Sequence, residues 1–338
     1  MYVFRPGPII SKMHCKEPKD MPDIPDDMMR DQLLDRVGKY HLDIRLGIEQ
    51  AHHARVFGQG RTFFHPENWY SVHRLMRFIL RATLLDGKVR RNARNIQVEN
   101  NIVTINGLAK PLDGFTILQI SDLHLDMAPD LPHALIACVR ELEYDICVMT
   151  GDYRARTYGP CEAALRALQQ LRLHLSDQVY AILGNHDSIR MLPAIEEMGV
   201  RVLVNQSVRF VRDDAELFVC GIDDPHYHRA DNMEKAVLEV PSDAVSVLLS
   251  HSPEVYRHAS CAGFDLMLCG HTHGGQICLP GGIPLLCNAD CPRAFCRGVW
   301  RYHRLQGYTS RGSGVSILDA RLNCPPEVTL HTLRRGDA

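Results

Sequence analysis

The sequence predicts an α/β protein in which short strands alternate with helices from about residue 94 onward. Three observations support this prediction: short apolar runs recur along the chain, helical stretches separate several of them, and no repeat of roughly 20 to 50 residues is present. The chain has 338 residues, 45% of them hydrophobic, which suffices for a sizeable core in one large or two ordinary domains. A disordered protein is therefore excluded.

Residues 1–93 are predicted to form an extension that precedes an α/β domain at 94–338. Five prolines lie between charged residues in the first thirty positions, which is typical of an irregular arm. Apolar residues then recur at helical spacing from Met28 to about Val56 and again from Pro66 to about Leu85, which predicts two helices.

The second of these predicted helices is amphipathic and basic. Trp69 and Tyr70 stand at its start, and its two faces carry different residues: Val72, Leu75, Met76 and Ile79 on one, Arg74, Arg77 and Arg81 on the other. Two interpretations stay open. The helix packs on the main domain with a solvated arginine face, or residues 69–85 contact a membrane surface.

The remaining elements follow in order. Residues 96–105, IQVENNIVTI, are predicted to form a hairpin with Asn100 and Asn101 in the turn. Seven further strands are predicted at FTILQIS, DICVMT, VYAIL, VRFV, LFVCGI, VSVLLS and DLMLC. Helices are expected at Leu131–Leu142, Cys161–Leu173 and Pro193–Met198, so the progression is β-α-β early and rich in strands later.

Charge and cysteine usage exclude several classes of protein. Thirty-eight Lys and Arg against 40 Asp and Glu give a net charge of -2, so nothing global favours a nucleic-acid partner. No apolar run approaches the roughly 18 residues of a membrane span, and the first residues lack the apolar core of a signal peptide. We expect a cytoplasmic protein, with peripheral attachment to the inner face of the membrane left open, and 12 reduced cysteines.

Polar side chains follow five of the predicted strands at the point where each strand ends. These residues are Asp122 and His124, then Asp152, then Asn185, His186 and Asp187, then His251, and finally His271 and His273. Because ligands of α/β sheets bind beyond the carboxyl ends of the strands, we expect these clusters to converge on one rim. The glycines before Asp152, Asn185 and His271 permit a sharp departure from the strand.

The residue types indicate a metal site. Asp, His and Asn offer oxygen and nitrogen ligands without thiolate, which suits divalent transition metals. Seven candidate ligands are too many for one tetrahedral ion and suit two cations that share a carboxylate. In Asp122-x-His124 and His271-x-His273, an extended backbone would point both side chains toward the rim.

The segments SDLHLD, TGD, GNHD, LLSHSPE and CGHTHGGQ resemble the five blocks of the calcineurin-like metallophosphoesterase family, over about Phe115 to Leu333. The resemblance implies a four-layer α/β/β/α sandwich. It implies a first ion held by Asp122, His124, Asp152 and His273, and a second held by the bridging Asp152 with Asn185, His251 and His271. It makes His186 the group that contacts the phosphate or protonates the leaving oxygen, with Asp187 orienting its ring. Ala155 departs from the family, many of whose members have Asp or Asn there.

The ending GYTSRGSGVSILDARLNCPPEVTLHTL resembles a bacterial branch of the family, which includes small phosphodiesterases and hydrolases of the lipid A precursor UDP-2,3-diacylglucosamine. We therefore expect a hydrolase of phosphodiester or pyrophosphate bonds, in which two divalent ions (Mn, Fe, Zn or similar) activate a bridging hydroxide. Two alternatives are kept: a peripheral membrane hydrolase of that lipid precursor, and a metal-bound scaffold without turnover. The expected substrate is a phosphate ester, nucleotide- or lipid-linked, and not a specific nucleic acid.

Weaker expectations concern the surroundings of the site. Arg154 and Arg156 either contact the phosphate or belong to a solvated loop. The segment GIDDPHYH, with Asp223, Asp224, His226 and His228, forms a substrate wall or a polar turn. Cys287, Cys291 and Cys296 lack the paired spacing of zinc ribbons, so a structural metal there is the less favoured interpretation.

Overall fold

The computed structural model describes residues 26–57 and 85–336. The irregular arm and the basic helix expected at residues 66–85, including Arg74, Arg77 and Arg81, lie outside the described residues except for Leu85. No helix in the described ranges is long and apolar enough to cross a membrane.

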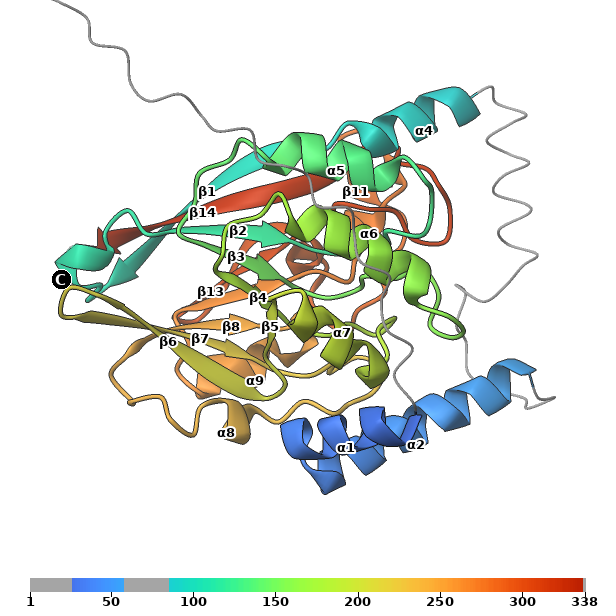
Figure 1. Cartoon of the computed structure of the whole chain (residues 1–338). Helices are drawn as coiled ribbons and strands as arrows, with labels where there is room; N and C mark the ends of the chain where they lie inside the picture. The colour runs from blue at the N-terminus through green and yellow to red at the C-terminus, as the bar shows by residue number, and fades with distance from the viewer. Residues whose placement is uncertain (1–25, 58–84, 337–338) are drawn as a thin grey trace, which may run out of the picture.

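Two six-stranded sheets form the centre of the molecule (Figure 1). The first sheet has the order β1 (Gln97–Asn106), β14 (Glu327–Gly336), β2 (Thr116–Ile120), β3 (Ile146–Met149), β4 (Val179–Ala181) and β5 (Arg201–Val202). The second has the order β12 (Gly298–Tyr302), β13 (Leu305–Thr309), β9 (Leu266–Cys269), β8 (Val245–Leu249), β7 (Ala215–Gly221) and β6 (Gln206–Arg212). A short pair, β10 (Cys278–Leu279) and β11 (Ile283–Pro284), stands apart.

Parallel pairing places the ends of the central strands together. β2, β3, β4 and β5 run parallel in the first sheet, and β7, β8, β9 and β13 run parallel in the second. Both faces of such strands are covered, so their sequences are continuous apolar runs. Ile146–Met149 and Leu266–Cys269 are buried at every residue, which explains why the apolar runs predicted these strands well.

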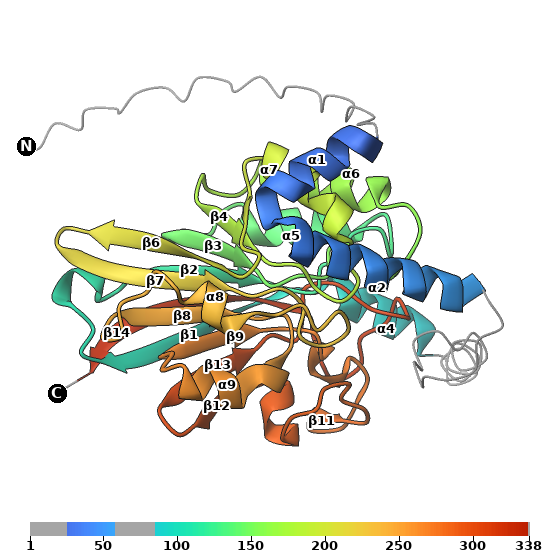
Figure 2. The same ribbon diagram turned by 90° about the horizontal axis from the view of Figure 1, so that it is seen from below.

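Three apolar cores define four layers. The core between the sheets includes Ile117, Val148, Val247 and Leu268. On the outer face of the first sheet pack α1 (Asp26–Val37), α2 (Lys39–Phe57), α5 (Leu131–Val139), α6 (Glu162–Arg172) and α7 (Leu192–Glu197). On the outer face of the second pack α8 (Met233–Ala236) and α9 (Tyr256–Cys261). The expected α/β/β/α sandwich is confirmed, with α4 (Asp86–Arg94) packed separately on the loops at 126–131 and 315–322 (Figures 1 and 2).

Some predicted elements are wrong. The hairpin at 96–105 does not form: β1 is one continuous strand that pairs in parallel with β14, because its alternate residues Val103 and Ile105 are buried between the sheets. The helix predicted over Met28 to Val56 is two helices, since Gly38 has φ +83 and ends α1. The expected helices at 131–142, 161–173 and 193–198 are present with ends shifted by up to three residues.

The cysteines of the described part are free thiols, as the sequence predicts. Several are deeply buried, and burial raises the pKa of the Cys220 and Cys269 thiols to about 12. These residues therefore act as small apolar side chains of the core.

Candidate metal centre

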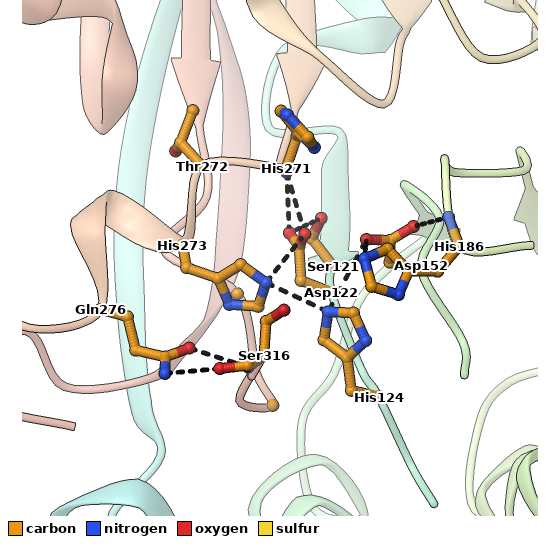
Figure 3. Close-up of polar contacts among 12 residues, drawn as sticks. Ser121, Asp122, His124, Asp152, His186, His271, Thr272, His273, Gln276 and Ser316 are labelled. Atoms are coloured by element: carbon orange, nitrogen blue, oxygen red, sulfur yellow. Dashed lines mark hydrogen bonds and ion pairs between the residues drawn. The ribbon is translucent and has the colours of Figure 1, made fainter. Parts of the chain in front are cut away.

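The predicted polar clusters converge, and they do so from two sheets rather than along the rim of one. Asp122 and His124 follow β2, Asp152 follows β3 and Asn185 follows β4, all in the first sheet. His251 follows β8, and His271 and His273 follow β9, in the second sheet. Figure 3 shows Asp122 facing His271, His273 and His124, with Asp152 and His186 to one side.

The backbone at this site is left-handed rather than extended. Five of the seven candidate ligands have positive φ: Asp122, His124, Asp152, His271 and His273, between 40° and 71°. Non-glycine residues adopt this conformation at a cost in energy and do so mainly where neighbouring structure enforces it. The extended spacing expected for Asp122-x-His124 and His271-x-His273 is therefore wrong, although both pairs of side chains do reach the site.

The first donor group contains Asp122, His124 and His273. Their ligand atoms lie within 4.8 Å of one another, with His124 Nε2 3.1 Å from His273 Nε2 and His273 Nε2 3.5 Å from Asp122 Oδ1 (Figure 3). Two ring nitrogens bound to one tetrahedral ion at about 2.0–2.1 Å would stand roughly 3.3 Å apart. The spacing observed in the structure is close to that value.

The second donor group contains Asp152, His251 and His271, joined by Asn185. Asn185 Oδ1 lies 2.9 Å from His251 Nε2 and 2.9 Å from His271 Nδ1. Asp152 is shared: its Oδ1 lies 3.4 Å from His251 Nε2, and its Oδ2 lies 3.6 Å from His124 Nε2. One carboxylate thus faces both donor groups.

Backbone carbonyls orient the imidazole rings. His124 Nδ1 donates to Arg154 O at 2.8 Å, His251 Nδ1 to Thr150 O at 2.8 Å, and His271 Nε2 to Asn288 O at 2.6 Å. Because a carbonyl only accepts, the ring nitrogen facing it carries a proton, which leaves the other nitrogen of a neutral ring free to bind an ion. The donor set is thus arranged for divalent cations, and the residues fit the metal that the resemblance implies.

Burial and charge set the protonation of the site. Burial, aided by neighbouring His186, lowers the pKa of His124; burial, aided by His226 and His251, lowers the pKa of His271 well below its ordinary value. For His251 the negative charges of Asp152 and Asp122 outweigh burial and raise the pKa to about 10.

The pKa of Asp152 is shifted in the opposite direction from that of His251. Burial opposes its charge, yet His251 and His186 outweigh burial and lower the pKa of Asp152 well below the ordinary value. The shared carboxylate is therefore ionised, which is the form that binds a cation.

Gly184 and Gly270 lie so close to neighbouring side chains that a Cβ would not fit, and this is the reason for glycine at both positions. A Cβ at Gly270 would overlap Ser121 Oγ and Asp122 Oδ2, and a Cβ at Gly184 would overlap Asp152 Oδ1. Neither glycine has a positive φ. Only Gly151, with φ +92, serves the sharp turn that the sequence predicts for all three positions.

His186 and Asp187 differ in part from expectation. His186 Nδ1 donates to Ala155 O at 2.9 Å, and its Nε2 lies 3.9 Å from Asp152 Oδ2. The Asp187 carboxylate accepts instead from the backbone N–H groups of Asp152, Tyr153 and Gly184, at 2.7, 2.9 and 2.8 Å. Asp187 therefore shapes the loop of Asp152, and the carbonyl of Ala155 orients His186.

Arg154, for which the sequence leaves phosphate contact and a solvated loop open, is buried and bound to its own loop. Arg154 is 5% exposed, and its guanidinium donates to the carbonyls of His186, Gly159 and Thr157 at 2.6 to 3.1 Å. A guanidinium held by three carbonyls supports the loop rather than a ligand. Arg156, two residues later, is exposed.

The GIDDPHYH segment divides into two parts. The His226 ring centre lies 4.0 Å from that of His271, and His226 Nδ1 faces Glu254 Oε1 at 2.9 Å, so this side chain borders the site. His228 is buried against Asp224 at 2.8 Å, and Asp223 is buried against α2. In this segment, the His226 side chain contacts a candidate ligand, His271.

The cysteine cluster contacts the candidate site through the backbone of one member, Cys296. Cys291 Sγ and Cys296 Sγ lie 4.0 Å apart, and Cys296 O accepts from Thr272 Oγ1 at 2.5 Å, which steadies the loop between His271 and His273. Among the described residues, the groups of side chains able to hold a metal ion do not include these thiols.

Sequence reasoning missed several contributors. Asn288 offers a carbonyl to His271, and a fully buried Arg321 lies behind His273, donating to His273 O at 2.9 Å and approaching Nδ1 at 3.2 Å. Backbone carbonyls leave no trace in a sequence. Arg321 lies in the C-terminal segment that resembles a bacterial branch of the family, and this resemblance was the one feature of the sequence that could have indicated its role.

Comparison with known proteins agrees with this geometry. A family model described as calcineurin-like phosphoesterase matches residues 115–275. An uncharacterized metallophosphoesterase of Bacillus subtilis, YkoQ, is 28% identical over 256 residues, covering 73% of this chain and 93% of that protein. Phosphodiesterase YaeI of Escherichia coli is 27% identical over 230 residues, covering 64% of this chain and 81% of that protein. A second uncharacterized metallophosphoesterase of Bacillus subtilis, YkuE, is 29% identical over 233 residues, covering 66% of this chain and 80% of that protein.

The two-sheet sandwich and its shared-carboxylate cluster define a metal-dependent phosphoesterase. All seven candidate ligands lie within residues 115–275, the part of the chain that matches the calcineurin-like phosphoesterase family model.

Proposed function

We propose that this protein hydrolyses phosphodiester or pyrophosphate bonds with two divalent ions. The observation that carries the proposal is the position of Asp152, whose two carboxylate oxygens face different donor groups. Asp122, His124 and His273 would hold one ion with Asp152, and Asn185, His251 and His271 would hold the other. When bound, such ions supply a water of lowered pKa and neutralise charge on the phosphate oxygens.

Two histidines of the chain would act on the substrate itself: His186 would transfer a proton, and His226 would contact the substrate. His186 Nε2 borders Asp152 while Nδ1 is fixed by Ala155 O, so Nε2 is the nitrogen available to the leaving oxygen. His226, held by Glu254, would border the substrate's other substituent. The relative named a phosphodiesterase supports a diester over a monoester substrate.

The first test is a hydrolysis panel on protein reconstituted with Mn²⁺ or Zn²⁺, comparing a phosphomonoester, a phosphodiester, a cyclic nucleotide and UDP-2,3-diacylglucosamine. We expect the diester or the pyrophosphate to be cleaved fastest. Preference for the monoester would contradict the proposal, and absence of turnover with both ions bound would favour the scaffold alternative.

The second test uses site variants. Asp152→Asn should abolish turnover and lower metal content, while Asp213→Asn, an exposed left-handed aspartate, should change neither. His186→Ala should lose rate and keep both ions; loss of an ion would place His186 among the ligands, since its ring lies within 4.8 Å of His124 and Asp152 donors. Wild-type turnover of Asp152→Asn would refute the site.

We make two further proposals about the N-terminal extension. The first is a domain boundary, with the extension at residues 1–93 and the phosphoesterase domain at 94–338; the second is contact with a membrane. The charge pattern of residues 69–85 supports contact with an anionic membrane surface that presents a lipid-linked substrate. Co-sedimentation with anionic liposomes should be lost when Arg74, Arg77 and Arg81 are changed to Glu, and indifference of the wild type to anionic lipid would remove this proposal.

A further inference from the structure

Helix α2 packs directly behind the loop that carries Asn185 and His186. Its residues Leu42 and Arg45 are both fully buried, and Leu42 and Leu46 belong to the core on the outer face of the first sheet. α2 precedes the stretch that matches the phosphoesterase family by more than fifty residues, so the family match assigns it no role.

Two side chains of α2 hold three consecutive residues of that loop. Arg45 Nη2 donates to Asp187 O at 2.9 Å. Glu49 Oε2 accepts from Ser188 Oγ at 2.6 Å, and Glu49 Oε1 accepts from Ile189 N at 2.8 Å. Hydrogen bonds to charged groups are among the stronger ones, so these contacts fix the backbone immediately after Asn185 and His186.

The same helix holds the segment that carries His226. Arg45 Nε lies 3.5 Å from Asp223 Oδ2, and His41 Nε2 lies 2.8 Å from the same oxygen. Arg45 and Asp223 are both fully buried, and a buried charge that loses its partner is strongly destabilising. α2 therefore ties together two loops that border the site from different sheets.

We propose that α2 is a positioning element of the metal centre, in which Glu49 and Arg45 set the loop that presents Asn185 and His186. The inference rests on the proposed function for its effect on turnover. Its effect on the loop and on metal binding does not depend on which ester is cleaved. Glu49 is the sharper probe, because its side chain is 18% exposed. Its Oε1 also lies 3.7 Å from Nη2 of the buried Arg45, but Arg45 keeps Asp223 as a charged partner at 3.5 Å when Glu49 is changed.

The experiment compares three variants of the full-length protein. Glu49→Ala removes both contacts with the loop. Glu49→Gln keeps them, because the amide oxygen can accept from Ile189 N while the NH₂ group donates to Ser188 Oγ. Asp43→Asn is the matched control: it lies on α2 and pairs with the exposed side chains of Lys39 and Arg30, away from the site.

Three measurements are made on each variant: Mn²⁺ affinity by calorimetry, hydrogen exchange of the 184–189 amides, and kcat with KM on bis(p-nitrophenyl) phosphate. For Glu49→Ala we expect about 10-fold weaker binding of one ion, about 10-fold faster exchange and about 10-fold lower kcat, with KM within about 3-fold of wild type. Glu49→Gln should return each value to within about 3-fold, and Asp43→Asn should match the wild type.

A folded Glu49→Ala with wild-type metal affinity and loop exchange would overturn the inference, as would an equal effect of Asp43→Asn. If Glu49→Ala does not fold, Ser188→Ala removes the Oγ contact from the loop side and is judged by the same criteria. If the wild type cleaves no phosphate ester while Glu49→Ala still weakens metal binding, the proposed function fails and the positioning role stands.

Discussion

The close approach of Gly270 to Asp122 gives the sharpest mutational prediction. Gly270 follows β9 of the second sheet, and Asp122 follows β2 of the first. His271 N lies 3.0 and 3.1 Å from the two oxygens of Asp122, so the two loops are in direct contact there. A methyl group at position 270 would occupy the space of Asp122 Oδ2 and Ser121 Oγ.

The magnitude follows from the displacement required. An ordinary contact of a Cβ begins near 3.4 Å, so the Asp122 oxygen must move by more than about 1 Å, in a place where Ser121 and Asp122 are fully buried. A misplacement of about 1 Å can lower catalysis on the order of 100-fold, or about 2.7 kcal/mol in kcat/KM. The hydrogen bond from Ser121 Oγ to Asp122 Oδ2, 2.6 Å long, would be lost as well.

The assay measures kcat/KM on bis(p-nitrophenyl) phosphate and metal content by mass spectrometry for Gly270→Ala. Gly47→Ala is the control, because Gly47 lies in α2 with nothing within 4 Å of the added methyl. That change should leave turnover intact and stabilise the fold by about 0.5–1 kcal/mol through helix propensity. A folded Gly270→Ala with wild-type turnover and two ions would refute the packing argument.

Three further predictions concern protons and metal. Because the pKa of His251 is raised to about 10, Mn²⁺ binding at pH 7 should release about one proton, measured by calorimetry in buffers of different ionisation enthalpy; His251→Asn should release about one fewer. Burial lowers the pKa of His331 to about 3, and its ring sits neutral between Asn101 and Gln119. The unfolded state then binds more protons below about pH 6.5, so stability falls with acid, and denaturant titrations should show wild type losing about 2 kcal/mol more than His331→Gln between pH 7 and 5. Chelation should abolish turnover while far-UV circular dichroism stays unchanged; unfolding on chelation would contradict a pre-formed site.

The sequence predicts well those elements whose structure depends on residues within the element itself. Continuous apolar runs such as Ile146–Met149 are buried on both faces and therefore identify strands directly. The run at 96–105 alternates apolar and polar residues around Asn100 and Asn101, which also fits a hairpin, and only its partner β14, more than two hundred residues away, decides in favour of one strand. Pairing over such distances is not encoded near the residues concerned.

The same distinction applies to the site. Ligand types could be predicted because Asp, His and Asn after apolar strands carry their chemistry in the side chain. The roles of Asp187 and Arg154 could not, because both serve backbone groups of neighbouring loops: Asp187 accepts from Asp152 N, and Arg154 donates to His186 O. A charged residue beside a metal motif is equally compatible with binding the ligand and with bracing the loop, and only the geometry separates these roles.

The left-handed ligands show how the two sheets act together. Residues in that conformation need an enforcing framework, and here each loop supplies the hydrogen bonds of the next: Asp122 N donates to Gly151 O at 3.1 Å and His124 N to Asp152 O at 3.0 Å. The C-terminal segment completes the frame, since Ser313 N and Gly314 N donate to the carbonyls of Ser121 and Asp122 at 2.8 and 2.9 Å. Because these backbone contacts between loops support the left-handed conformations, we expect the donors to lie near one another before metal binds, which the chelation experiment tests.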